Sequence, residues 1–186
     1  SASKIHTSML SLLFLLSSYF MTTPPEWTWS LHPEAGFKVL SPVSLMHDVK
    51  EVPTPTGMIQ YHQYSGGSLT DSTLSLAIVI DHYELPLTAD IPSDDYYREF
   101  FETTIDEILV AIDGSLVYSD YLSHSDHVEY VWKANYQNGK DIVKGTLIVA
   151  GNRYYGLQIF GKQEDYPDEL MNRFTNSFKL TEVTKF

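Results

Sequence analysis

The stretch VEYVWKANYQNGKDIVKGTLIVAGNRYYGLQIFG, residues 128–161, decides the fold class of this protein. It holds three runs in which apolar side chains recur at every second position, a period that is typical of β-strands. The runs are separated by NGK (138–140) and GNR (151–153), which favour tight turns. Strands joined by such turns pair antiparallel, so the sequence predicts a three-stranded meander.

Shorter strands are predicted ahead of the meander. Turn residues bound four extended runs, at residues 27–31, 37–42, 58–65 and 74–83. The segment 41–57 carries three prolines, which interrupt strand pairing, and we interpret it as an irregular crossing. GGSLTDS (66–72) is interpreted as a turn because glycine and small polar residues dominate it.

Two helices complete the pattern. Residues 92–114 predict a helix in which Ser93 caps the start and Gly114 follows the last turn. Its apolar residues recur at helical spacing and predict a face packed on the core: Tyr97, Phe101, Ile105, Ile108 and Ile112. DYPDELMNRFTNSF (165–178) predicts a closing helix. Strands and helices do not alternate, so the predicted class is α+β, an antiparallel β-sheet flanked by helices as an α/β/α sandwich, and not a Rossmann fold.

Residues 1–25 form an apolar N-terminal segment that ends in a proline linker, and residues 26–186 are predicted to form a single α+β domain. The apolar run from Met9 to Met21 is too short to span a bilayer, which takes about 20 residues. Its length suits a secretory signal, and a helix docked on the domain is the alternative. We expect a protein that is exported, to the periplasm or another extracytoplasmic space, or tethered at the membrane by this segment; a cytoplasmic location stays open.

Composition excludes several functional classes. The chain has 24 acidic and 12 basic side chains, a net charge of −12, and no basic run. We therefore expect no nucleic-acid partner and no docking on anionic lipid, so any membrane contact would come through the N-terminal segment alone. The absence of cysteine excludes disulfides, thiolate metal ligands and a lipid-modified cysteine.

The stretch SHSDH, residues 123–127, contains two histidines and an aspartate within five positions, which makes it the leading candidate for a metal-binding or catalytic site. In an extended strand, His124 and Asp126 would share one face, while His127 would point to the other side with Glu129. A looped conformation could instead bring His124, Asp126 and His127 to one divalent cation, with His62, Asp81 or His82 as candidates to complete the site. Otherwise the stretch is a polar start to a strand, which is the simpler interpretation. Ser123, His124 and Asp126 also have the residue types of a catalytic triad, but adjacent positions rarely give its geometry.

Several segments, taken in order, resemble a known family. These are GFKVLSP (36–42), the helix at 94–112, the meander, and RYYGLQIFG to FTNSFKL (153–180). Over about residues 27–181 the chain resembles the Mog1/PsbP-like fold family, which includes bacterial PsbP-related proteins. The resemblance implies an antiparallel sheet flanked by helices and a non-enzymatic role in assisting larger assemblies, as PsbP does for photosystem II and Mog1 for the small GTPase Ran. SDHVEY (125–130) departs from the small residue, often glycine, that precedes this strand in such relatives.

These observations predict a non-catalytic accessory or binding domain of the Mog1/PsbP-like kind that acts on a protein partner and needs no cofactor. Trp27, Trp29 and Trp132 are candidates for its binding surface, although packing in the core is the favoured interpretation of each. The alternatives are a divalent-cation-binding protein that uses His124, Asp126 and His127, and an enzyme of unrecognised type. No convergent catalytic set is present in the sequence to favour the enzyme.

Overall fold

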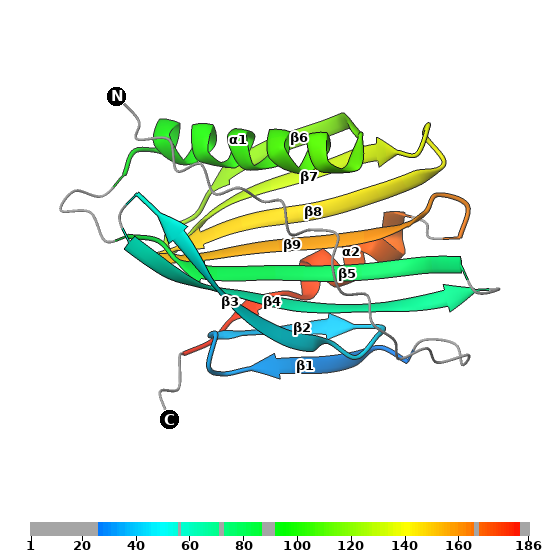
Figure 1. The fold of residues 1–186 in the computed structure, drawn as a ribbon, viewed down its shortest axis with the longest axis horizontal. Coiled ribbons are helices and arrows are strands. Elements are labelled where there is room, and N and C mark those ends of the chain that lie inside the picture. The colour runs from blue at the N-terminus through cyan, green and yellow to red at the C-terminus, as the bar shows by residue number, and fades with distance from the viewer. Residues whose placement is uncertain (1–25, 56, 71–72, 87–91, 166–167, 183–186) are drawn as a thin grey trace.

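The computed structural model describes residues 26–55, 57–70, 73–86, 92–165 and 168–182. The predicted N-terminal segment, 1–25, lies outside these residues. Seven strands form one antiparallel sheet in the spatial order β3-β4-β5-β9-β8-β7-β6 (Figure 1). Their bounds are β3 Met46–Thr54, β4 Gly57–Thr70, β5 Thr73–Glu84, β6 Ser115–Ser123, β7 Val128–Tyr136, β8 Asp141–Ala150 and β9 Arg153–Lys162. The predicted meander, β7-β8-β9, is confirmed.

A second, smaller sheet lies beside the first. It has the order β1-β2-β10, with β1 at Thr28–His32, β2 at Phe37–Ser41 and β10 at Lys179–Leu180. The turn between β1 and β2 includes Gly36 at a φ of 70°, a left-handed conformation that glycine adopts without strain. The predicted strands at 27–31 and 37–42 are therefore present, and the C-terminal end of the described chain pairs with the second of them.

The two helices lie on opposite faces of the large sheet. Helix α1 spans Asp94–Ile112 and begins where the Ser93 side chain accepts a hydrogen bond from the Tyr96 backbone N–H, as predicted. It buries Phe101, Ile105 and Ile108 against β7, β8 and β9. Helix α2 spans Asp168–Ser177 and buries Met171 and Phe174 against the other face.

The sheet thus separates two hydrophobic cores, which we call the α1 core and the α2 core. The α1 core includes Trp132, which is fully buried over its cross-strand partner Gly145. A Cβ at Gly145 would lie 2.5 Å from the indole nitrogen, so only glycine leaves room for the ring. The α2 core also takes in Phe37 and Val39 of the small sheet. Since α2 is short and shares its face with β1-β2-β10, the fold is dominated by its sheets and is not the simple α/β/α sandwich that the sequence predicted.

Two predicted segments are wrong. Residues 41–57 are not an irregular crossing, because Met46–Thr54 form strand β3, which pairs with β4 along its whole length. GGSLT is not a turn either, since β4 continues through Thr70. Strand β6, Ser115–Ser123, was not predicted. Among the described residues no helix is both long enough and apolar enough to cross a membrane.

Candidate functional site

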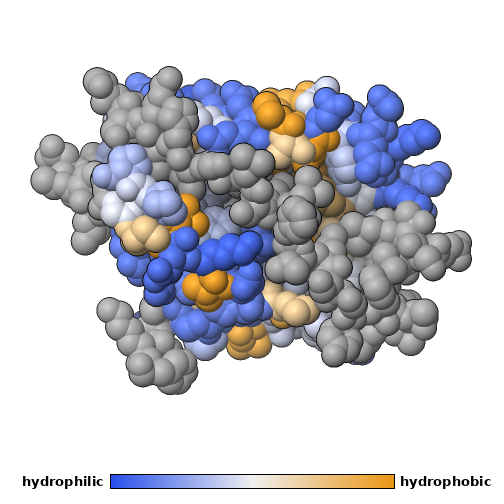
Figure 2. All heavy atoms as spheres, viewed as in Figure 1, coloured by the Kyte–Doolittle hydropathy of each residue, from blue (hydrophilic) through white to orange (hydrophobic). Residues whose placement is uncertain are grey.

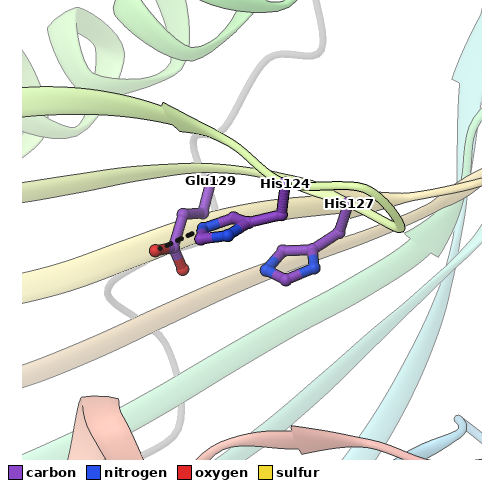
Figure 3. A group of neighbouring side chains, drawn as sticks. All are labelled: His124, His127 and Glu129. Atoms are coloured by element: carbon purple, nitrogen blue, oxygen red, sulfur yellow. Dashed lines mark hydrogen bonds and ion pairs between the residues drawn. The ribbon is translucent and has the colours of Figure 1, made fainter.

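The SHSDH stretch forms the tip of the β6–β7 hairpin. Strand β6 ends at Ser123 and β7 begins at Val128, and the loop between them is closed by a 2.9 Å hydrogen bond from the His124 backbone N–H to the His127 carbonyl. The loop conformation cancels the strand alternation that would place His124 and His127 on opposite faces. Their imidazoles instead stack, with ring centroids 4.4 Å apart and ring planes 17° from parallel (Figure 3).

Glu129 joins the two histidines. Its Oε1 lies 3.2 Å from His124 Nε2, and all three side chains point to the same side of the hairpin (Figure 3). One ligand atom each from His124, His127 and Glu129 lie within 4.8 Å of one another, which makes them a candidate set of metal ligands. Strand alternation already places Glu129 on the same side as His127, so the signal for this third member was present in the sequence.

Asp126, the third residue of the predicted cation site, lies beside His127. Its Oδ1 lies 2.7 Å from His127 Nδ1, so it partners the imidazole and is not in the candidate ligand set. That hydrogen bond holds the pKa of Asp126 below its ordinary value. The carboxylate therefore accepts a hydrogen bond from Nδ1–H, which leaves the lone pair of the neutral His127 ring on Nε2.

The residues proposed to complete the cation site lie elsewhere, on the neighbouring strands β4 and β5. His62 pairs across these strands with His82, and His62 Nδ1 also lies 3.0 Å from His47 Nε2 on β3. His82 is buried, and its Nδ1 lies 2.9 Å from the Tyr154 carbonyl. Desolvation lowers the pKa of His82 to about 4. Neither histidine belongs to the hairpin cluster.

Asp81 lies on the opposite face of β5 from His82, at the centre of a buried polar group. Its carboxylate accepts hydrogen bonds from Gln63 Nε2 at 3.0 Å and from Gln158 Nε2 at 3.4 Å, and from the Tyr61 hydroxyl. Burial raises its pKa to about 6, against the opposing effect of the hydrogen bonds from Tyr61 and Gln63. Among the described residues Gln158 Oε1 has no hydrogen-bond partner. Asp81 and Gln158 are buried, while Tyr61 and Gln63 are partly exposed.

Strand β6 is an exposed edge of the large sheet. Within the described chain it pairs only with β7, and four of its nine residues are exposed apolar side chains: Leu116, Val117, Tyr118 and Leu122. Val110 of α1 adds another, 84% exposed. Figure 2 shows apolar residues in orange at the upper edge of the molecule, over α1, bordered by hydrophilic ones.

The three tryptophans have separate environments. Trp132 is fully buried in the α1 core, and Trp27 packs against the α2 core beneath the Arg173 guanidinium, 4.8 Å from the ring centroid. Trp29 is 45% exposed on β1. Only Trp29 therefore offers much of its ring to a partner.

No family model matches the sequence, and no curated protein matches it by sequence. One solved structure with a similar fold is the solution structure of cyanobacterial PsbP (CyanoP) from Synechocystis sp. PCC 6803. The TM-score is 0.55 over 89% of this chain and 98% of that chain, at 11% sequence identity. This chain has a PsbP-like fold. At that identity the similarity concerns the fold, and it agrees with the resemblance carried by residues 27–181.

Proposed function

We propose that this protein is a non-catalytic accessory domain that binds a protein partner along the edge strand β6. The observation that carries the proposal is the exposed and largely apolar character of this edge, which has one charged residue and an irregular register with β7 at Val117. A PsbP-like fold fits an accessory role. An extended segment of the partner would add to β6 as a further strand, with affinity from main-chain hydrogen bonds and specificity from its alternate side chains.

The two edges of the large sheet differ in a way that favours β6. Strand β3 has the sequence MHDVKEVPT, in which charged residues and a proline discourage pairing with another chain. Strand β6 has the sequence SLVYSDYLS, in which Asp120 is the one charged residue. An apolar edge without these charges and this proline is open to pairing with a further strand, which supports a partner that occupies it.

Binding at β6 can be tested by placing a photo-crosslinking amino acid at position 117 in cells, identifying the adduct and purifying that partner. With purified proteins, we expect Val117→Lys to weaken binding at least about tenfold, since a charge then replaces a buried apolar contact. Val49→Lys on β3 is the matched control, because Val49 and Val117 are 45% and 51% exposed on the two edges. It should bind as the unaltered protein does.

Equal binding by both variants would refute the role of β6. Sedimentation that shows self-association lost on Val117→Lys would assign the edge to a second copy of this chain and refute a separate partner. Turnover by the purified protein, abolished by a single His or Asp substitution, would refute the non-catalytic role.

We also propose that the protein acts outside the cytoplasm, either exported or tethered by its N-terminus. The support is the apolar run of residues 9–21, whose length matches the apolar region of a secretory signal. Mass spectrometry of the protein from its native cells should show a chain from which that run has been removed, or an intact chain in the membrane fraction. An intact chain in the soluble cytoplasmic fraction would contradict the proposal.

A further inference from the structure

We infer that the tip of the β6–β7 hairpin is a Zn²⁺ site in which His124, His127 and Glu129 are the ligands and Asp126 positions His127. The inference stands apart from the proposed partner binding, because it rests on the side chains of the loop and not on the β6 edge. Two imidazoles and one carboxylate make up a recognised zinc donor set, which leaves a fourth position to water or to a group from another molecule.

The local geometry prepares His127 to bind the metal. Because Asp126 Oδ1 accepts from Nδ1 at 2.7 Å, the tautomer that presents a lone pair on Nε2 is favoured. A carboxylate behind a ligating histidine also fixes the ring and raises its basicity, and losing such a partner typically costs about 10–100-fold in metal affinity. Asp126 is therefore a positioning residue whose effect on binding can be measured.

The three ligand side chains are accessible to an ion from solvent, and their donor atoms are close enough to reach it. The side chains of His124 and Glu129 are 42% and 21% exposed, and that of His127 is 22% exposed. Donor atoms around a tetrahedral zinc lie about 3.3 Å apart, given Zn–N bonds of roughly 2.0–2.1 Å. Atoms already within 4.8 Å must therefore approach by up to about 1.5 Å, which rotation of these partly exposed side chains supplies.

Metal binding has a structural consequence. Two imidazoles stacked at 17° cannot both direct a lone pair at one ion, so the rings must rotate out of the stack. The contact between His124 Nε2 and Glu129 Oε1 is replaced by bonds from these side chains to the metal. Each imidazole then offers the lone pair of one ring nitrogen to the metal.

The pair His47 and His62 is the natural control. Its ring nitrogens lie 3.0 Å apart, yet among the described residues it belongs to no group of three metal-ligating side chains. Among the described residues no third ligand atom converges with these two imidazoles, so they would hold zinc more weakly than the hairpin set.

The experiment is titration calorimetry of the full chain with Zn²⁺ at neutral pH. We expect one saturable site that is lost in the double variant His124→Gln/His127→Gln and kept in His47→Gln/His62→Gln. Glu129→Gln should weaken it, and Asp126→Asn should weaken it by about tenfold or more. In nitrogen-15 spectra, Zn²⁺ should shift Nε2 of His127 by more than Nδ1, a readout that holds even if the double variant does not fold.

Three results would overturn the inference. They are the absence of saturable heat, heat that is unchanged in Glu129→Gln and Asp126→Asn, and heat that is lost in the His47→Gln/His62→Gln control while the hairpin nitrogens stay unshifted. The last result would move the zinc site to β3 and β4.

Discussion

At the scale of single residues, Asp81 and His82 are adjacent and buried, and burial shifts their pKa values in opposite directions. Burial raises the pKa of Asp81 from its ordinary 3.8 to about 6, and lowers the pKa of His82 from 6.5 to about 4. Between about pH 4 and 6 the folded protein therefore holds a proton on Asp81 that the unfolded chain has released. In the same range it lacks a proton on His82 that the unfolded chain carries.

The two residues oppose each other in the pH dependence of stability. For Asp81 the free energy of unfolding falls as pH rises through about 4–6, and its stabilising contribution is lost above about pH 6. For His82 the contribution is present above pH 6.5 and is lost as pH falls towards 4. Each amounts to about 3 kcal/mol, because a tenfold change in proton affinity corresponds to roughly 1.4 kcal/mol. We expect them largely to offset each other in the unaltered protein.

Asp81→Asn should therefore stabilise the protein at neutral pH. The amide removes the buried charge. Once the Gln158 side-chain amide turns over so that Oε1 faces position 81, the new amide N–H can donate to this atom, which has no hydrogen-bond partner among the described residues. We expect the free energy of unfolding at about pH 7.5 to rise by about 2–3 kcal/mol, and then to fall on acidification as His82 becomes unopposed. Urea unfolding at about pH 4.5 and 7.5 measures both effects. Asp120→Asn, a change on the edge strand β6, is the control and should leave the free energy of unfolding unaltered at both pH values. An Asp81→Asn variant that is less stable than the unaltered protein at neutral pH would contradict the prediction.

The residues of the candidate metal site could be predicted in part. His124 and His127 follow from the rarity of histidine and from their proximity in the sequence, and both are in the candidate ligand set. Glu129 was visible only as the residue that shares a face with His127. The alternation of side chains along a strand does not predict the loop at 124–127. The hydrogen bond between His124 and His127 in this loop depends on the pairing of β6 with β7. Because the sequence did not predict β6, it gave no basis for predicting the conformation of the loop that follows this strand.

At the scale of elements, sequence patterning works where one face of a strand is buried and fails at the edges. Strand β7 alternates buried and half-buried side chains along most of its length, and its period is plain. Strands β3 and β6 are the two edges of the sheet and are largely exposed on both faces, so they show no such alternation. These are the two strands of the large sheet that the sequence did not predict.

The extension of β4 has another cause. Glycine in a strand marks a close approach of backbone, and a Cβ at Gly66 would collide with the Ser44 carbonyl oxygen. The chain that precedes β3 thus crosses β4 where a side chain would not fit. Gly66 is a packing requirement in a continuing strand, which local sequence alone does not distinguish from a turn.

At the scale of the whole molecule, one sheet joins two cores. Strand β8 contributes Ile142 and Ile148 to the α2 core and Val143, Leu147 and Val149 to the α1 core. Strand β9 likewise places Tyr155 on one side and Tyr154 on the other. Neither core can lose its packing without disturbing strands that the other needs, so we expect the domain to unfold as a single cooperative unit.

Phe101→Ala and Phe174→Ala test this cooperativity, since each removes one fully buried ring from one of the two cores. Either change should cost about 3–5 kcal/mol, because a cavity is left where the ring was. In a single cooperative unit, the slowest amide protons of β2 and β7 exchange only on global unfolding. Phe101→Ala should then accelerate exchange by roughly 100-fold or more in both strands, although β2 lies in the other core. Hydrogen exchange followed by NMR measures this, with Val49→Lys as a surface control that leaves both strands protected. Acceleration confined to β7 would show instead that the α1 core opens by itself, and that the shared strands do not couple the two faces of the sheet.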